Sequence, residues 1–175
     1  MPKIRLDHRP SKVWTDGSCI NNGSAGASAA IGVCYGDGDK RNFASRILGT
    51  KQTNNRAELM AILFVLVTNC GTRSLHIYSD SLYSIRCLTT YYHRWEQNGW
   101  VTARGDRVES AELIRYALNM IKQRNEYGST TTLEHVRGHN GDINNSIADH
   151  FAHTAAATIV ESGKIRLLRS MGVPF

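Results

Sequence analysis

The sequence has no long apolar run, and this shortage excludes a membrane-spanning helix. Its longest unbroken stretch of apolar residues extends only from Leu59 to Val67, whereas a helix needs about 20 such residues to cross a bilayer. The opening segment, MPKIRLDHRP, also lacks the apolar stretch of a secretory signal. We therefore expect a protein that is neither embedded in a membrane nor exported.

Cysteine is scarce, and its few positions show no paired spacing. The chain has four cysteines, scattered along its first half: Cys19, Cys34, Cys70 and Cys87. Small disulfide-stabilised domains instead carry closely spaced cysteines. The pattern predicts free thiols in a reducing compartment, the cytoplasm or the nucleus. Internal repeats and low-complexity segments are absent as well.

The composition is that of an ordinary globular protein. A chain of 175 residues with 41% hydrophobic and 21% charged residues is the size of one domain, and such a chain buries roughly 70% of its unfolded surface on folding. The net charge is +6, with basic residues near the start, in the middle and near the end. This charge favours polyanionic partners without identifying one.

Hydrophobic periodicity divides the chain into strand-like and helix-like segments. The predicted strands are residues 12–19, 27–36, 41–48, 74–80 and 130–138. The predicted helices are residues 54–70, 81–92, 109–125 and 143–158, with a short helix and an exposed loop between the second and the third. Ile143, Ile147 and Phe151 recur at helical spacing in the last helix. This order predicts a mixed sheet with helices packed against it.

Four acidic residues stand out by their positions in these segments. Asp16 lies inside the first predicted strand, where Asp is depleted and where no helix cap is available to it. The other three have structural alternatives. Asp80 suits the N-cap of the following helix. Glu58 suits a capping box with Asn55, and Asp149 suits an ion pair with a histidine one turn further on.

These acids converge if the first and fourth strands lie side by side with the first and last helices nearby. Such a cluster repels itself and raises its own pKa values unless a cation neutralises it. Carboxylate oxygens with no cysteine nearby suit Mg²⁺ or Mn²⁺. The chemistry typical of this arrangement is phosphoryl transfer with two metal ions about 3.5–4 Å apart.

Five short motifs follow one another along these elements. They are TDGS at 15–18, TNNRAE at 53–58, YSDS at 78–81, HVRGHNG at 135–141 and ADHFAH at 148–153. Together they resemble the ribonuclease H family in its cellular type 1 form. The resemblance implies an α/β ribonuclease H-like fold, a five-stranded mixed sheet with three antiparallel and then two parallel strands. It also implies a catalytic domain at 12–158, between an N-terminal extension at 1–11 and a C-terminal tail at 159–175, which we expect to be loosely held.

The activity implied by the resemblance is hydrolysis of the RNA strand of an RNA–DNA hybrid, leaving 5′-phosphate and 3′-hydroxyl ends. It assigns two Mg²⁺ ions, replaceable by Mn²⁺, to four carboxylates: Asp16, Glu58, Asp80 and Asp149. One ion would activate a water and the other would stabilise the departing 3′ oxygen, so no side chain has to act as nucleophile. His139 matches a histidine that assists proton movement or product release.

The resemblance also implies which residues contact each strand of the hybrid. Residues matched to the RNA side, where amides meet the 2′-hydroxyl, are Asn22, Asn54 and Asn55. Residues matched to the DNA side are Lys51, Thr53, Tyr83, Tyr91, Trp95 and Ser110. Relatives often place an asparagine where this chain has Ser110. The segment 91–107 is poor in lysine, which predicts modest and salt-sensitive affinity for the hybrid. Nothing in the sequence requires more than a monomer.

Three alternatives remain open from the sequence. A zinc site can be built from four histidines: His135, His139, His150 and His153. It is less favoured because His135 falls in a predicted strand and structural zinc sites usually include cysteine. The chain could also be a catalytically silent hybrid-binding module, although all four acids are present. Finally, it could be a resolvase or integrase-type nuclease. The asparagines beside Glu58 argue against this alternative, because they favour recognition of ribose.

Overall fold

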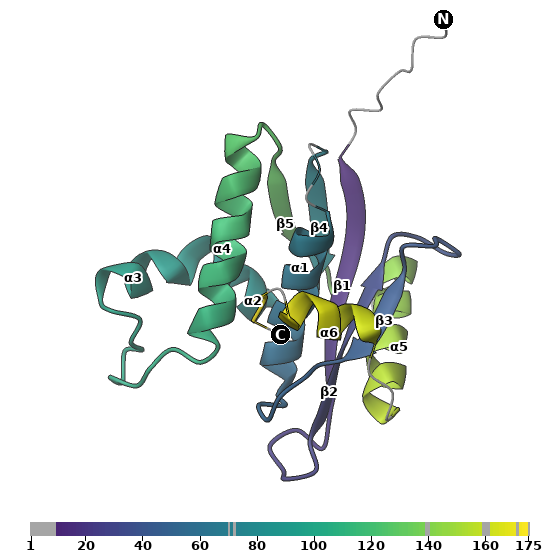
Figure 1. The fold of residues 1–175 in the computed structure, drawn as a ribbon, viewed down its shortest axis with the longest axis horizontal. Helices are drawn as coiled ribbons and strands as arrows, with labels where there is room; N and C mark the ends of the chain where they lie inside the picture. Colours follow the sequence, from purple (N-terminus) through teal and green to yellow (C-terminus); the bar gives the residue numbers. More distant parts are fainter. Residues whose placement is uncertain are drawn as a thin grey trace, which may run out of the picture.

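A single mixed sheet organises the chain. The computed structural model describes residues 10–69, 71, 73–138, 141–158, 162–170 and 172–174, in which five strands have the order β3-β2-β1-β4-β5 (Figure 1). Neighbours among β3, β2 and β1 are antiparallel, and neighbours among β1, β4 and β5 are parallel. This confirms the predicted sheet. The strands are β1 (Ser11–Ile20), β2 (Ser28–Cys34), β3 (Phe43–Arg46), β4 (Leu75–Ser79) and β5 (Thr131–His135).

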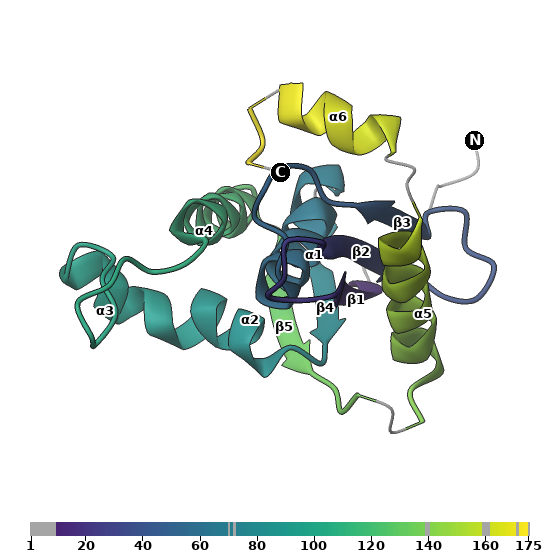
Figure 2. The ribbon, with the colours of Figure 1, turned by 90° about the horizontal axis from the view of Figure 1, so that it is seen from below.

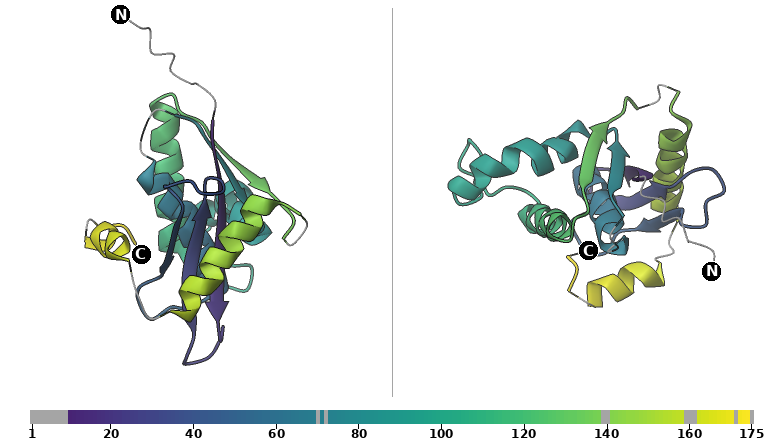
Figure 3. Two further views of the ribbon diagram at one scale, coloured as in Figure 1. Left: turned by 90° about the vertical axis from the view of Figure 1, so that its right-hand side faces the viewer. Right: turned by 90° about the horizontal axis from the view of Figure 1, so that it is seen from above.

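Helices cover both faces of the sheet. The central helix α1 and its neighbour α4 lie on one face, and α5 lies on the other (Figure 3). Burial of α1 from Ala57 to Leu66 explains why its sequence is apolar nearly all round. The helices are α1 (Asn54–Thr68), α2 (Leu82–Arg86), α3 (Tyr92–Gln97), α4 (Ala111–Glu126), α5 (Ile143–Ala157) and α6 (Gly163–Ser170).

The segment between β4 and α4 forms an arm. A π-helical turn, Cys87–Tyr91, joins α2 to α3 without a break, whereas the sequence predicts one helix over 81–92 followed by a separate short one. Figure 2 shows α3 and the loop after it projecting away from the sheet. Tyr91 and Trp95 lie on this segment, and both are partly buried against the main core cluster.

The buried face of α5 is not the face that the spacing of its large apolar residues predicts. Small residues, among them Ala148 and Ala152, face the sheet and are 0% exposed, while Ile143 is 71% exposed. The approach is close because β2 carries Gly32 there: a Cβ on Gly32 would stand 2.0 Å from the carbonyl oxygen of Ala148. This close approach therefore favours small residues on the buried face of α5.

The described part of the C-terminal segment, for which the sequence suggests a loose tail, contains a helix that contacts the core. Helix α6 packs against the core through Ile165, which is fully buried. The ammonium group of Lys164 lies 5.0 Å from the centre of the Phe64 ring. Among the described residues, no helix is long and apolar enough to cross a membrane. Cys19, Cys34 and Cys87 are free thiols, and Cys70 lies outside the described residues.

Candidate active site

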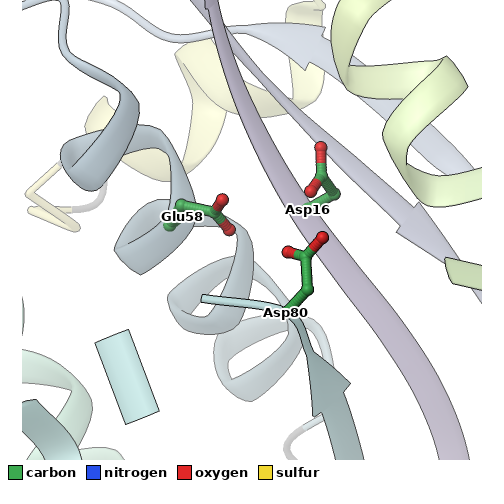
Figure 4. A group of neighbouring side chains, drawn as sticks. All are labelled: Asp16, Glu58 and Asp80. Carbon is green, nitrogen blue, oxygen red and sulfur yellow. The ribbon is translucent and has the colours of Figure 1, made fainter. Parts of the chain in front are cut away.

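Three carboxylates from separate elements meet beside the centre of the sheet. Asp16 lies in β1, Glu58 in α1, and Asp80 directly after β4 (Figure 4). Each offers an oxygen atom, and these atoms lie within 4.8 Å of one another. Asp16 and Glu58 are each 5% exposed. Two of the three carboxylates are therefore almost removed from water.

Strand register brings Asp16 beside Asp80. In the parallel pairing of β1 with β4, Thr15 lies opposite Ser79, so the next residue of each chain segment is an aspartate at the same level. The pairing and β4 both end there, while β1 continues to Ile20. Ligands favour this position in sheets with parallel strands, since the carboxyl ends leave room between neighbouring connections.

Helix capping by other residues leaves two of the acids available. Thr53 is the N-cap of α1, because its hydroxyl accepts a hydrogen bond from the backbone N–H of Arg56 at 3.3 Å. The capping box suggested for Glu58 is therefore wrong. Ser81 caps α2 by accepting from Ser84 N–H at 3.3 Å, so Asp80 is not the N-cap either.

Burial and mutual repulsion favour the protonated form of these acids. Burial, followed by the charges of Asp80 and Asp149 and a hydrogen bond with Asp80, raises the pKa of Asp16 to about 8. Burial and then the charges of Asp16 and Asp80 hold the pKa of Glu58 well above its usual range. The Gly17 backbone hydrogen bond offsets both shifts only in part. The site needs either bound protons or a cation.

The donor set fits a hard divalent cation. The buried Oε2 atom of Glu58 has no hydrogen-bond partner among the described residues, so this oxygen is free to coordinate. The three available ligands are carboxylates, and oxygen-only ligands suit Mg²⁺ and related ions better than Zn²⁺. A cation would also remove the repulsion that raises the pKa values of Asp16 and Glu58.

Asp149 lies to one side of this group. Helix α5 carries it, half-buried, and its negative charge contributes to the raised pKa of both Asp16 and Glu58. It is not one of the three residues whose oxygens lie within 4.8 Å of each other. The convergence of four acids expected from the sequence is thus a group of three with a fourth nearby.

The histidines give no comparable cluster in the described part of the chain. There, the three carboxylates are the only group found that could hold a metal ion. His139, expected to assist proton movement, lies outside the described residues. His150 and His153 are exposed on α5, and His135 ends β5.

The asparagines expected on the RNA side gather at the start of α1. The side-chain oxygen of Asn22 accepts a hydrogen bond from the backbone N–H of Asn54 at 3.4 Å. Asn55 follows in the first turn with its side chain exposed, and Glu58 lies one turn further along the same helix. The loop after β1 and the start of α1 therefore present polar groups beside the carboxylates.

Four of the six residues expected on the DNA side line two surface pockets. Lys51 and Ser110 line one of about 760 Å³ together with Arg107 and Arg115. Tyr91 and Trp95, with ring centres 5.6 Å apart, line another of about 400 Å³ on the arm.

The two other residues expected there have structural contacts. Thr53 caps α1 as described above. Tyr83 is half-buried on α2 and hydrogen-bonds to Cys87, and burial raises the pKa of its hydroxyl.

Sequence reasoning missed three polar residues near the site. Trp14 donates a hydrogen bond to Asp142, the N-cap of α5, and Asn145 in the first turn of α5 donates one to Asp80. An Asp preceding a helical pattern is a start signal that would have identified Asp142. The partners 128 and 65 residues away along the chain leave no signal in one sequence.

The chain matches the RNase H family over residues 8–157. It is 41% identical over 145 residues to the Ribonuclease H of Schizosaccharomyces pombe, a match that covers 83% of this chain and 52% of that relative. The Ribonuclease H of Bordetella avium is 31% identical over 151 residues, with 86% and 93% covered. The crystal structure of LC9-RNase H1 superimposes with a TM-score of 0.62 at 28% identity, covering 96% of this chain and 85% of that one.

The span of the family match includes the positions of the carboxylate group, Asp16, Glu58 and Asp80. The chain spans about half the length of the Schizosaccharomyces pombe relative and of human Ribonuclease H1, of which matches cover 52% and 49%. The family match nevertheless takes in all five strands and helices α1 to α5. On this extent of similarity, the chain belongs to the RNase H family.

Proposed function

We propose that this protein is an endonuclease that hydrolyses the RNA strand of RNA–DNA hybrids, dependent on Mg²⁺ or Mn²⁺ and leaving 5′-phosphate and 3′-hydroxyl ends. The observation that carries the proposal is the group formed by Asp16, Glu58 and Asp80, whose oxygens lie within 4.8 Å of one another. Membership of the RNase H family supports the substrate class. We propose that the protein acts as a monomer.

The proposed metal ligands are the three grouped carboxylates and the neighbouring acid: Asp16, Glu58, Asp80 and Asp149. Two bound cations would supply Lewis-acid chemistry, activating water and neutralising charge on the phosphate and the departing 3′ oxygen. The protein's own task is to hold these carboxylates close together in a partly dry setting, where a bound cation would favour their deprotonated form. No side chain in the described group has to form a covalent bond to the substrate.

Selection of the substrate would depend on residues on both sides of the acids. On the RNA side, the amides of Asn22, Asn54 and Asn55 both donate and accept, which suits a 2′-hydroxyl. Residues proposed for the DNA strand are Lys51, Thr53, Tyr83, Tyr91, Trp95 and Ser110. The basic side chains of the pocket that Lys51 lines suit the phosphate backbone. The aromatic rings of the pocket on the arm suit stacking with sugars and bases. His139, by its sequence motif, is proposed to assist proton movement or product release.

The test is cleavage of a hybrid whose RNA strand is labelled, with and without Mg²⁺. The wild-type protein should cut that RNA endonucleolytically and leave duplex DNA and branched DNA intact. Asp80→Asn should lower the rate by at least about 10³-fold while binding the hybrid normally. Asp106→Asn, an identical change at an exposed acid of the arm, is the matched control.

Other outcomes discriminate among the alternatives. Hybrid binding without cleavage at any Mg²⁺ concentration would identify a silent binding module. Preferential cutting of branched DNA would identify a resolvase-type nuclease. Full activity in Asp80→Asn would contradict the assignment of the metal ligands.

A further inference from the structure

The first turn of α5 is tied to β1 by a hydrogen bond between side chains. The indole N–H of Trp14 donates to Oδ2 of Asp142 at 2.9 Å. The other oxygen of Asp142 accepts from the backbone N–H groups of Asn144 and Asn145, at 3.0 and 3.1 Å. One carboxylate therefore caps the helix and fixes it to the strand that carries Asp16.

The indole is held in place by a stack of rings on the open face of β4. The Trp14 and Tyr78 rings have centres 4.8 Å apart and lie 15° from parallel. On its other side, Tyr78 stacks on His76 at 4.4 Å. His76 in turn contacts a carboxylate oxygen of Glu134, on β5, at 2.7 Å. Three neighbouring strands thus restrain the orientation of the Trp14 N–H.

The same helical turn contacts the acidic group. Asn145 is 2% exposed, and its side-chain N–H donates to Oδ2 of Asp80 at 3.4 Å. The side-chain oxygen of Asn145 is buried and has no hydrogen-bond partner among the described residues. Because it is buried, the Asn145 side chain cannot replace this hydrogen bond with one to water if the helix shifts. Its distance to Asp80 therefore depends on where α5 begins.

We propose that Trp14 is a positioning residue for the metal-binding carboxylates. Its N–H fixes Asp142, and Asp142 fixes the turn in which Asn145 meets Asp80. The same helix carries Asp149. The inference rests on the proposed function, since it concerns the same acids, but it concerns a contact that none of the five sequence motifs contains. Partners that orient metal ligands change metal affinity or activity by about 10- to 100-fold when they are removed.

The test compares two matched substitutions in the ring stack. Trp14→Phe keeps an aromatic ring on Tyr78 and removes the N–H that Asp142 accepts. Tyr78→Phe keeps the stack and removes a hydroxyl that hydrogen-bonds to His76 at 3.4 Å. For each protein, calorimetric titration with MgCl₂ alone gives the affinity for Mg²⁺. Steady-state cleavage of hybrid at limiting Mg²⁺ gives kcat and KM, and thermal unfolding gives stability.

Trp14→Phe should weaken Mg²⁺ binding by about tenfold and lower kcat at limiting Mg²⁺ by a similar factor, with KM for the hybrid unchanged. Tyr78→Phe should change neither by more than about twofold. Asp142→Asn provides a second test, because Asn still caps a helix but presents an amide N–H₂ to the indole N–H. The double variant that combines Trp14→Phe with Asp142→Asn should bind Mg²⁺ no more weakly than the more impaired of the two single variants, as expected for two residues that share one interaction.

Equal Mg²⁺ affinity and kcat in Trp14→Phe and the wild-type protein would overturn the inference, whether or not the variant is less stable. Equal losses in Trp14→Phe and Tyr78→Phe would also overturn it, since the stack and not the N–H would then be responsible. A wild-type protein that binds Mg²⁺ without cutting hybrid would contradict the proposed function alone, because the calorimetric comparison does not involve the hybrid.

Discussion

Gly17 and Glu58 touch through their backbones. A Cβ added to Gly17 would stand 2.2 Å from the backbone nitrogen of Glu58, closer than any real side chain can approach. This missing Cβ lets α1 lie against β1, directly after Asp16. Because Glu58 extends from that point of contact, the close approach brings its carboxylate within reach of Asp16.

Substitution of Gly17 by Ala should therefore separate α1 from β1. We expect the free energy of unfolding to fall by about 1–3 kcal/mol, as for other overpacked sites, and Mg²⁺ affinity to fall with it. Chemical denaturation and calorimetry measure the two effects. Gly26→Ala is the control, since no atom lies within 4 Å of its added Cβ. Wild-type stability and affinity in Gly17→Ala would show that the contact is not needed.

Without metal, stability should fall as the pH rises from about 4 to about 8. The pKa of Asp16 is about 8 in the folded protein, against a usual value of 3.8. Between these values the folded state holds a proton that the unfolded state has released, so a rise in pH favours unfolding. Glu58 acts in the same direction, because its pKa is also raised. Each kcal/mol lost lowers the Tm by about 2–4 °C in a chain of this size.

Thermal unfolding in a chelator, compared with saturating Mg²⁺, measures this dependence. The difference in Tm between the two conditions should widen toward pH 8, since bound metal removes the repulsion. A metal-free Tm that rises over the same pH range would contradict the raised pKa values of Asp16 and Glu58.

Removal of one charge should stabilise the metal-free protein. Asp80→Asn deletes the charge and the hydrogen bond that raise the pKa of Asp16. We expect the Tm at pH 8 without metal to rise by several degrees, about 1–2 kcal/mol, and the Asp16 pKa, followed by NMR, to fall. With Mg²⁺ the order should reverse, because the wild-type protein alone gains full metal binding. A lower metal-free Tm in Asp80→Asn would contradict repulsion within the group.

Hybrid binding should be salt-sensitive and should involve the arm. Arg94 lies beside Tyr91 and Trp95 in the pocket on the arm. If it contacts a phosphate, Arg94→Ala should weaken hybrid binding and reduce the slope of log K against log salt by about 1. Lys40→Ala, an exposed cation in the β2–β3 connection, should leave the slope unchanged. Fluorescence anisotropy at several salt concentrations measures both.

The sequence predicts the main elements well because their signals are local. Alternation and helical spacing identify all five strands and the long helices, and the apolar α1 is the buried helix that its composition indicates. The meeting of Asp16 and Asp80 could be proposed because parallel neighbours end at the same edge. The features that the sequence does not predict depend on contacts between segments that are far apart in the chain.

Three such features illustrate the limit. Close approach to Gly32 favours small residues on the buried face of α5, whereas the Ile and Phe spacing suggests another face. Packing of Ile165 on the core orders α6. The hydrogen bond from Trp14 to Asp142 depends on the position of β1 relative to α5, which periodicity does not encode.

The most direct test is the position of a bound divalent ion. Crystals of the wild-type protein soaked in MnCl₂ should give an anomalous scattering peak within ligand distance, about 2–2.5 Å, of oxygens from Asp16, Glu58 and Asp80. The same soak of Asp80→Asn crystals should give a weaker peak or none. A strong peak elsewhere, with none between these three carboxylates, would contradict the account.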